Sequence, residues 1–319
     1  MSRVLVTGAG GFIGYHLTAA LKAQGHWVRG VDLKTPEFGE PAADEFWIRD
    51  LRASIQCGPA MSDIDTVFAL AADMGGMGYI SYHDADILTS NLLISVNTAR
   101  AAWEHGVTKL IDASSACVYP EYRQDVTDSK PLAEDDAYPA QPQDGYGWEK
   151  LVTERLLTAY HDEGRLDVRI ARMHNIYGPQ GTWRGERAKA PAALCRKAAE
   201  AADGTDIEVW GDGKATRSFC YITDCIDGLL RLAESDWHEP LNIGSDRLIT
   251  VDGLARLAIA ASGKNLGIRH VAGPQGVRGR NSDNTLCRKV LGWEPQVTLE
   301  EGMARTYEWV ASQVAMVAA

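Results

Sequence analysis

The sequence predicts an α/β fold, in which a Rossmann-like, doubly wound parallel sheet is followed by a smaller C-terminal α/β substrate lobe. Short apolar segments alternate with segments of helical length through the first half of the chain. A glycine-rich turn joins the first apolar segment to the first helix. The chain has 319 residues, which corresponds to about two domains of roughly 150 residues.

The first half of the chain accounts for the parallel sheet. Its apolar segments are nearly continuous, as expected for strands that crossover helices bury on both faces. We predict strands, in chain order, at residues 3–7, 27–32, 46–50, 66–72, 109–115 and 167–173. We predict a short helix after residue 50 and longer helices at 11–24, 84–105 and 144–160.

The pattern becomes less regular after residue 174. Residues 175–188 are rich in Gly, Arg and Pro and predict a loop. Beyond it we predict helices at 191–202 and 223–234, strands near 208–210 and 218–222, a strand at 240–243, and three further helices. We therefore divide the chain into residues 1–175 and 176–319, with a boundary across which some segments return to the first sheet.

Composition and charge exclude several classes of protein. A formal net charge of −11 disfavours binding to nucleic acid phosphates. No apolar run approaches the ~20 residues that span a bilayer, and no charged and apolar leader opens the chain, so we expect no membrane association. The six cysteines show no CxxC spacing and no pattern of metal ligands. We therefore expect free thiols, no bound metal and a cytoplasmic location.

The glycine-rich turn has the spacing of a dinucleotide-binding motif. Residues 7–14 read Thr-Gly-Ala-Gly-Gly-Phe-Ile-Gly. Glycine at these positions permits a tight turn, close approach of the main chain to a pyrophosphate, and close packing of helix on strand. Glycines that serve only the turn are the alternative, but the preceding strand and the following helix agree with the motif. The candidate cofactor contacts in this turn are Gly8, Gly11, Phe12, Ile13 and Gly14.

Acidic residues after the second and third strands are candidates for contacts to the rest of the cofactor. Asp32 follows Gly14 by 18 residues, where a carboxylate binds ribose hydroxyls and would repel a 2′-phosphate. The motif therefore favours NAD over NADP, although the charge of Lys34 opposes this preference. Asp50 is a candidate for the adenine contact, and a helix cap is its alternative role.

A tyrosine and a lysine on one helix face predict oxidation and reduction at a hydroxyl group. Tyr146 and Lys150 are separated by one helical turn, and Ser115 ends a predicted strand upstream. The lysine ammonium and a positive nicotinamide would both lower the pKa of the tyrosine. Tyr146 would then remove a hydroxyl proton while hydride leaves for NAD, and Ser115 would share the hydrogen bond. A surface tyrosine beside a solvated lysine is the alternative.

The glycine motif, Ser115 and the Tyr–Lys pair, in this order, resemble the extended short-chain dehydrogenase/reductase family of nucleotide-sugar enzymes. Later strings agree with this resemblance, namely Arg-Ser-Phe-Cys-Tyr-Ile-Thr-Asp from 217, Asn-Ile-Gly from 242 and Leu-Gly-Trp-Glu-Pro from 291. The resemblance implies an NAD-binding domain over residues 1–175, with Ala71, Tyr146 and Lys150 among the cofactor contacts. It also implies a nucleotide-sugar substrate lobe over residues 176–319.

The residues after Ser115 indicate which reaction of that family to expect. In the family's sugar 4,6-dehydratases an Asp-Glu pair follows the serine, whereas this chain has Ala116 and Cys117. In 4-epimerases the second position is usually Thr or Ser, which takes no part in proton transfer, whereas a thiol can. Lys189 is a second candidate proton carrier. Two carriers on opposite faces of a sugar ring are what inversion requires, and a ketone at C4 would make both C3–H and C5–H acidic.

Further strings are similar to a group of GDP-sugar epimerases that invert C3 and C5, over residues from about 3 to 312. They lie at 72–78, 114–120, 174–179, 188–193 and 276–284. The resemblance implies that Tyr146 and Lys150 oxidise and reduce, that Cys117 and Lys189 act as base and acid, and that Ser115 assists. It implies substrate contacts at Gly75, Ser115, Ala116, Cys117, Asn175, Lys189, Ala190, Lys197, Arg217 and Arg280. It also implies a homodimer packed through the helices near 84–105 and 144–160.

Two residues depart from the pattern of that group. Ala188 replaces a glutamate and Ala215 replaces a glutamine. These changes bear on the expected sugar and pyrophosphate contacts and leave the proposed proton carriers in place.

Two basic segments are candidates for a pyrophosphate site. Residues 181–197 and 269–289 each contain five Lys or Arg residues and one acidic residue, and arginine forks suit phosphate oxygens. Two solvated loops are the alternative. Other functions also remain open at this point, namely a 4-epimerase without proton carriers, a net dehydrogenase, and a catalytically silent NAD-sensing protein.

Overall fold

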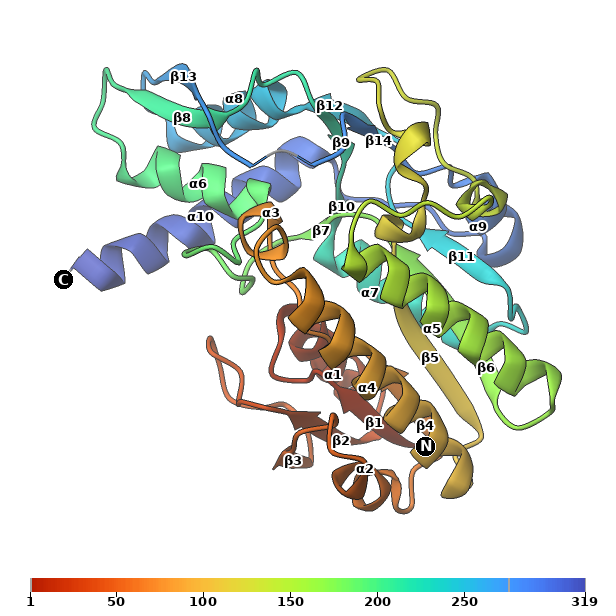
Figure 1. The fold of residues 1–319 in the computed structure, drawn as a ribbon. Helices are drawn as coiled ribbons and strands as arrows, with labels where there is room; N and C mark the ends of the chain where they lie inside the picture. Colours follow the sequence, from red (N-terminus) through yellow and green to blue (C-terminus); the bar gives the residue numbers. More distant parts are fainter. Residues whose placement is uncertain (1, 275, 319) are drawn as a thin grey trace.

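One seven-stranded parallel sheet forms the centre of the computed structural model, which describes residues 2–274 and 276–318 (Figure 1). Its strand order is β11-β6-β5-β4-β1-β2-β3, and every neighbouring pair is parallel. The strands are β1 (Arg3–Thr7), β2 (Trp27–Asp32), β3 (Glu45–Ile48), β4 (Thr66–Ala69), β5 (Lys109–Ser115), β6 (Asp167–Met173) and β11 (Pro240–Ile243). The predicted doubly wound sheet is confirmed.

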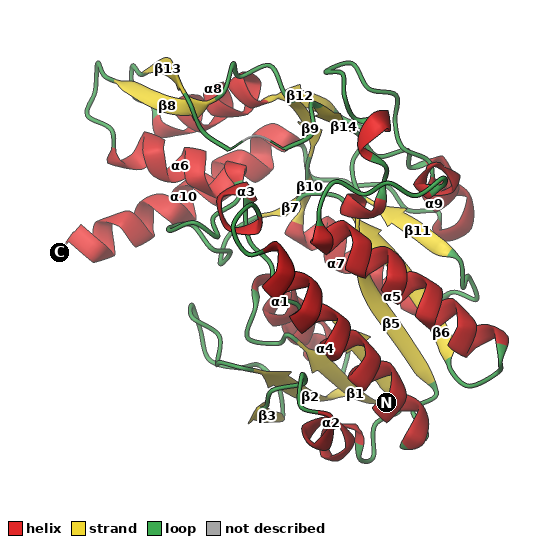
Figure 2. Ribbon diagram, viewed as in Figure 1, coloured by secondary structure: helices red, strands yellow, loops and turns green. Residues whose placement is uncertain are grey.

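Helices cover both faces of this sheet (Figure 2). Helices α2 (Ser54–Met61), α4 (Asp84–Glu104) and α5 (Gly145–Asp162) pack against one another on one face, and α1 (Phe12–Ala23) and α7 (Ile222–Glu234) pack together on the other. Side chains alternate along the strands. In β1, Leu5 joins the core on one face, whereas Val4 and Val6 join the core on the other.

The remaining elements gather mainly at the carboxyl ends of the central strands (Figure 1). They form a three-stranded sheet and two pairs of strands, accompanied by helices. The strands are β7 (Ile176–Tyr177), β8 (Asp206–Trp210), β9 (Thr216–Ser218), β10 (Cys220–Tyr221), β12 (Leu248–Thr250), β13 (Gly267–Val271) and β14 (Gly279–Arg280). The helices are α3 (Met77–Ile80), α6 (Ala190–Glu200), α8 (Val251–Ser262), α9 (Thr285–Leu291) and α10 (Leu299–Ala318). None of the described helices is long and apolar enough to cross a membrane.

Several predicted boundaries are wrong. The predicted strands 46–50 and 66–72 end earlier, at residues 48 and 69, and the predicted loop 175–188 contains β7. The predicted strand 218–222 is divided between β9 and β10 and the start of α7. Strands β12, β13 and β14 were not predicted, because they are short and hydrogen-bond to segments far away in the sequence.

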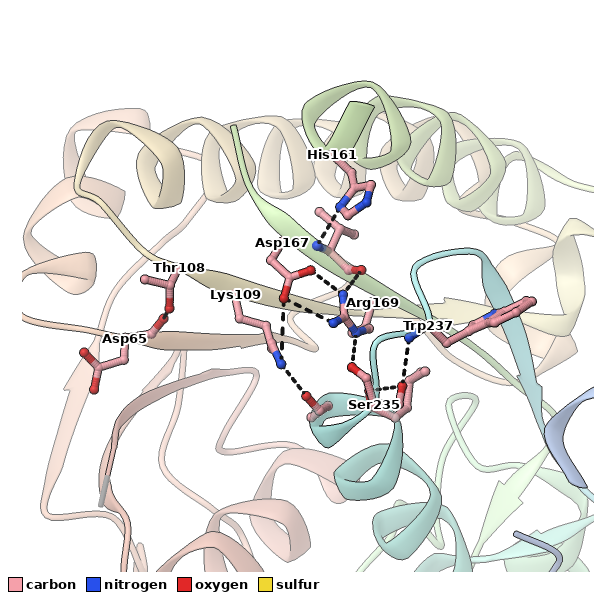
Figure 3. A network of polar contacts seen from close by, with 11 residues as sticks. Asp65, Thr108, Lys109, His161, Asp167, Arg169, Ser235 and Trp237 are labelled. Atoms are coloured by element: carbon pink, nitrogen blue, oxygen red, sulfur yellow. Dashed lines mark hydrogen bonds and ion pairs between the residues drawn. The ribbon is translucent and has the colours of Figure 1, made fainter. Parts of the chain in front are cut away.

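Basic side chains near the amino ends of β5 and β6 bind the carboxyl end of α7 (Figure 3). Lys109 Nζ donates to Ala233 O at 2.8 Å, and Arg169 Nε donates to Ser235 O at 2.8 Å. Both cations also pair with Asp167. Cations at this end of a helix bind its free carbonyl groups and offset its dipole.

A buried ion pair ties α5 to the carboxyl half of β6. Arg172 donates to both oxygens of Glu154, at 2.9 and 2.7 Å, and each side chain is 3% exposed. Ser114 Oγ donates to the same carboxylate at 2.5 Å. Arg172 also donates to Glu134 O at 2.6 Å, which connects the pair to the loop before α5.

Asp112 is a buried carboxylate in the middle of β5. One of its oxygens has no hydrogen-bond partner among the described residues, and the same holds for Thr98 Oγ1 on α4. Both side chains line a small cavity that Lys150 also lines. Burial raises the pKa of Asp112 to about 7, although Lys150 opposes this shift.

We predict that Arg172→Met lowers the free energy of unfolding by about 3–5 kcal/mol, because it leaves the Glu154 carboxylate buried without a partner. The double variant Arg172→Met/Glu154→Met should lose less than Arg172→Met alone. Urea unfolding followed by circular dichroism measures both. A loss below about 1 kcal/mol in Arg172→Met would contradict the structural role of the pair.

We predict that Asp112→Asn gains stability relative to the wild type between pH 5 and pH 8. A carboxyl whose folded pKa is raised contributes stability below its ordinary value of 3.8, and this contribution is lost as the pH rises toward about 7. Urea unfolding at both pH values gives the difference. The control Thr98→Val, which removes a buried hydroxyl without a titrating group, should differ from the wild type equally at both pH values. An equal difference for Asp112→Asn as well would contradict the prediction.

Candidate active site

The glycine turn lies between β1 and α1, as the sequence predicts. Gly8 adopts a left-handed conformation with φ of +73°, and its N–H donates to Val31 O at 2.8 Å. A Cβ on Gly14 would lie 2.1 Å from Gly8 O, so helix and turn approach too closely for a side chain. Gly10 N donates to Asp32 Oδ2 at 2.9 Å. The carboxylate at the end of β2 therefore lies beside the turn.

Most other predicted cofactor residues lie around the same turn. Ala71 N donates to Thr7 Oγ1 at 3.1 Å, and a Cβ on Gly8 would lie 2.9 Å from the same nitrogen. Phe12 and Ile13 begin α1. A hollow beside the turn is lined by Gly10, Gly11, Phe12, Tyr15, Lys34, Pro36, Glu37, Phe38, Gln180 and Thr182. This placement puts Lys34 near the end of β2, where the sequence predicts the ribose.

Asp50 has a different neighbour. Its carboxylate forms a bidentate ion pair with the Arg52 guanidinium, with a closest N–O distance of 2.7 Å. The hydrogen bond from Arg52 lowers the pKa of Asp50. Its side chain does not cap α2, whose N-cap residue is Ala53. The alternative of a helix cap is therefore not observed, and the adenine contact stays a prediction.

Tyr146 and Lys150 lie one turn apart on α5, with Lys150 Nζ 5.8 Å from the centre of the tyrosine ring. Both side chains are buried. Burial raises the pKa of Tyr146, while Lys150 and a hydrogen bond with Ser115 lower it in part. The sequence predicts a lowered pKa, but the loss of solvation on burial outweighs the effect of the Lys150 ammonium.

A buried network holds Lys150 in place. Burial by itself lowers the pKa of Lys150. The Glu149 carboxylate, 3.6 Å away, contributes to a larger opposite effect, so the net shift of the pKa is upward. Asn91 Nδ2 donates to Glu149 Oε1 at 3.1 Å and to Asp73 O at 3.0 Å. The sequence analysis missed Glu149 and Asn91, although they connect the catalytic helix to the loop after β4.

Cys117 occupies the turn between β5 and α5. Ser115 Oγ accepts a hydrogen bond from Cys117 N at 3.2 Å and so caps the short 3-10 helix over Ala116–Val118. A Cβ on Gly147 would lie 2.2 Å from Cys117 O, so α5 begins directly against this turn. Cys117 is half-buried, whereas the other five cysteines are fully buried. The thiol is therefore the accessible one.

Lys189 is the N-cap residue of α6, in the second half of the chain. Its side chain is accessible to solvent, yet the surrounding protein lowers its pKa by desolvation, and Cys117 opposes this shift. The two predicted proton carriers are thus within electrostatic range of each other. A lowered pKa makes the lysine a better proton donor near neutral pH.

The loop that carries Gly75 is held against the loop that carries Lys189. A Cβ on Gly76 would lie 2.6 Å from Ala188 O, so only glycine permits this approach. Arg187 donates to Asp73 Oδ1 at 2.8 Å and to Met74 O at 2.9 Å. The chain segments at 71–76 and 187–189 therefore pack together beside the site.

Arg217 and Arg280 lie on paired strands, β9 and β14, in direct register. Arg280 Nη1 donates to Cys117 Sγ at 3.2 Å. Burial lowers the pKa of Arg217 to about 9, and Arg280 adds to this effect. The structure thus brings two of the predicted substrate arginines to the side of the accessible thiol.

Other predicted substrate residues have local partners instead. Asn175 adopts φ of +45° at the end of β6 and donates to Ser218 O at 2.8 Å. Lys197 donates to Glu208 O at 2.8 Å, and burial lowers its pKa. Ala116 is buried in the turn before Cys117, and Ala190 is exposed at the start of α6. Contacts of these residues with a substrate stay predictions.

Most of the arginines in the two basic segments are neutralised by neighbouring carboxylates. Arg187, Arg196, Arg269, Arg278 and Arg288 form ion pairs with carboxylates. In these segments Arg280 contacts Cys117, and Lys189 is within electrostatic range of it. Arg217, outside both segments, is within electrostatic range of the same thiol.

Comparison with known proteins agrees with this geometry. A model of the NAD dependent epimerase/dehydratase family matches residues 4–244. GDP-mannose 3,5-epimerase of Arabidopsis thaliana is 47% identical over 314 residues, which cover 98% of this chain and 83% of the plant protein. GDP-mannose 3,5-epimerase 1 of Oryza sativa subsp. indica is also 47% identical, and the match covers 98% of this chain and 82% of that protein.

Solved structures of nucleotide-sugar enzymes have the same fold. UDP-glucose 4-epimerase of Thermotoga maritima, solved with UDP-glucose, superposes with a TM-score of 0.88 at 27% identity, over 98% of this chain and 99% of the other. MoeE5 in complex with UDP-glucose and NAD superposes with a TM-score of 0.83 at 28% identity, over 98% and 99% of the two chains. The chain belongs to the NAD dependent epimerase/dehydratase family.

Proposed function

We propose that this protein is an NAD-dependent GDP-mannose 3,5-epimerase. It converts GDP-D-mannose to GDP-L-galactose by inverting C3 and C5, and to GDP-L-gulose by inverting C5 alone. The observation that carries the proposal is the placement of an accessible thiol, Cys117, near Lys189 and against the start of the helix that carries Tyr146 and Lys150. The 47% identity to plant GDP-mannose 3,5-epimerases supports the choice of substrate.

The glycine turn fits a dinucleotide. A Cβ on Gly14 would collide with Gly8 O, so the close approach of main chain and helix leaves the first N–H groups of α1 available for a pyrophosphate. Gly8, Gly11, Phe12, Ile13 and Gly14 would hold the phosphates, with Ala71 beside them, Asp32 at the ribose and Asp50 toward the adenine. NAD, when bound, accepts hydride from C4 of the sugar and returns it later, so no net oxidation occurs.

Tyr146 moves the first proton. Its hydroxyl takes the proton of the C4 hydroxyl as the C4–H hydride leaves, and Lys150 and Ser115 stabilise the tyrosinate that this step requires. Burial, more than any other cause, raises the pKa of Tyr146, so the charge of Lys150 and the hydrogen bond with Ser115 are what favour the tyrosinate. On re-reduction the tyrosine returns a proton to the C4 oxygen.

Cys117 and Lys189 perform the inversion. The C4 ketone makes the hydrogens at C3 and C5 acidic, and the Cys117 thiolate removes one of them to become a thiol. The ammonium of Lys189 then delivers a proton to the opposite face of the same carbon. The lowered pKa of Lys189 favours this transfer at neutral pH, and exchange with solvent restores both groups.

Arginine side chains would bind the pyrophosphate of the substrate. Arg217 and Arg280 lie side by side on β9 and β14, and their forks suit phosphate oxygens. Gly75, Asn175 and Lys197 are the further substrate contacts we propose, in addition to Ser115, Ala116, Cys117, Lys189 and Ala190. Ala188 and Ala215 stand where the resemblance implies larger polar side chains, so neither contributes a polar side-chain contact to the substrate.

We also propose a homodimer that packs through α4 and α5. Both helices lie on one face of the sheet, and large apolar side chains on them reach solvent, namely Leu93, Val96, Trp103, Trp148 and Val152. Such side chains on neighbouring helices favour a partner surface. The six free thiols support a cytoplasmic location, and the small sheets after residue 176 support a division into residues 1–175 and 176–319.

Cys117→Ala and Tyr146→Phe should affect different steps of the reaction. We expect Cys117→Ala to retain the transient NADH absorbance on mixing with GDP-mannose but to lose about 10²-fold or more of the epimerised product. Tyr146→Phe should instead lower the transient absorbance itself. Stopped-flow absorbance and product chromatography give both readouts. The control Cys57→Ala, a buried thiol on α2, should keep both signals, and epimerised product at the normal rate from Cys117→Ala would sink the proposed role.

Val152→Glu should convert the dimer to a monomer, because a carboxylate at the centre of the proposed apolar interface would be buried without a partner. Light scattering after size-exclusion chromatography measures the mass. Val317→Glu, at an exposed site on α10, is the matched control and should leave the dimer intact. A wild-type protein that is monomeric at micromolar concentration would refute the proposed interface.

A further inference from the structure

We propose that Arg280 and Gln124 are positioning residues that hold the Cys117 side chain as a thiolate at the place of proton transfer. The inference rests on the proposed function, in which Cys117 is the base. It gives Arg280 a role in addition to the expected substrate contact, and it assigns a role to Gln124, which no sequence motif singles out.

The guanidinium of Arg280 is held between a sulfur and an amide. Its Nη1 donates to Cys117 Sγ at 3.2 Å, and its Nε donates to Gln124 Oε1 at 2.5 Å. The side chain is 8% exposed, so water does not compete strongly for these donors. No ion pair in the described residues includes Arg280. Its charge is therefore directed at the sulfur.

Gln124 fixes the orientation of that guanidinium. It is fully buried, and its Nε2 donates to Tyr119 O at 3.0 Å and to Pro120 O at 3.1 Å. Because both donors of the amide face carbonyl groups, its oxygen must face Arg280. Its main-chain carbonyl accepts a hydrogen bond from Arg278 N at 2.8 Å. Gln124 thus fastens β14 to the loop that follows the catalytic turn.

A guanidinium prefers the ionised form of such a thiol. It carries only donors, and a thiolate is a far stronger acceptor than a neutral thiol. The base must be the thiolate, since only that form can accept a proton from carbon. A single charge-assisted hydrogen bond of this kind changes the balance between the two forms by about tenfold or more.

Other charged and titratable groups also face the sulfur. Burial lowers the pKa of Lys189 and of Arg217 and raises that of Tyr146, and in each case Cys117 adds an upward contribution. These groups lie on the opposite loop, on β9 and on α5. In contrast to these three groups, Arg280 donates a hydrogen bond directly to the Cys117 sulfur.

One carboxylate acts on Arg280 from the start of α5. Burial raises the pKa of Asp144, and its hydrogen bond from Gly147 N and the charge of Arg280 lower it in part. Asp144 accepts that N–H at 2.9 Å as the cap of α5. It forms no ion pair with Arg280, so it leaves the contact between guanidinium and sulfur in place.

The test uses Gln124→Met, which keeps the volume of the side chain and removes its hydrogen bonds. Iodoacetamide alkylation of Cys117 is followed against pH in the intact protein, because the other five cysteines are buried. We expect the midpoint of the alkylation profile to move up by about one pH unit. We also expect product formation to fall about tenfold at pH 7 and to recover at higher pH. An alkylation midpoint equal to that of the wild type would overturn the proposal.

Arg280→Lys keeps the positive charge but loses the fork that bridges the sulfur and the amide. It tests the same contact if Gln124→Met does not fold, and it should move the alkylation midpoint in the same direction. A merely structural role would lower product formation equally at every pH and would leave the midpoint in place, which would overturn the proposal for either variant.

Failure of the proposed function gives a different result. If Cys117→Ala forms product at the normal rate while Gln124→Met still moves the alkylation midpoint, Cys117 is not the base but the contact of Arg280 with the thiolate stands. If Cys117→Ala is inactive and the midpoint does not move, the base stands and the positioning role falls.

Discussion

The buried ion pair between Arg172 and Glu154 is the contact on which the catalytic end of this molecule depends most. It joins the end of β6 to α5, the helix that carries Tyr146 and Lys150. Neither charge reaches solvent, so each is compensated only by the other and by neighbouring hydroxyl and carbonyl groups. Through Ser114 the same carboxylate also holds the end of β5. The distance between the Tyr–Lys pair and the strand end is fixed in this way.

The chemistry gathers where the parallel strands end. A parallel sheet directs all of its carboxyl ends to one edge, and loops at this edge form the site. The glycine turn follows β1, the turn with Cys117 follows β5, and the helix with Tyr146 begins directly against that turn. Segments from the second half return to this edge, where Arg280 donates a hydrogen bond to the thiol and Lys189 is within its electrostatic range. Separate parts of the chain therefore supply the Tyr146–Lys150 pair and Lys189, the residues to which we assign hydride transfer and the second proton transfer.

The sequence predicts the parts of the fold that carry a strong local signal. The strands 3–7, 109–115, 167–173 and 240–243 have the predicted bounds, because most of their residues are buried and the short apolar stretches within them stand out from the flanking sequence. Strands such as β14 are two residues long and depend on partners far away, so no periodicity reveals them.

The same distinction holds for the site. Gly8, Tyr146 and Lys150 belong to local motifs, so the sequence alone is enough to predict them as site residues. The bond between Arg280 and Gln124 spans 156 residues, and neither residue type marks a site by itself. The number of charges in a segment also does not show which of its side chains face the site. Arg278 pairs with Asp212, whereas Arg280, two residues later, contacts the Cys117 thiol.

Proton NMR of the purified protein with GDP-mannose in D2O, without added NADH, tests the central claim most directly. If Cys117 and Lys189 carry the protons, deuterium from the solvent must enter the sugar at C5 and C3 while the signals of an L-sugar appear. Inversion at C4 without deuterium from solvent would contradict the account, because a 4-epimerase needs no proton carrier at Cys117 or Lys189. A sugar that neither exchanges nor changes configuration would contradict it as well.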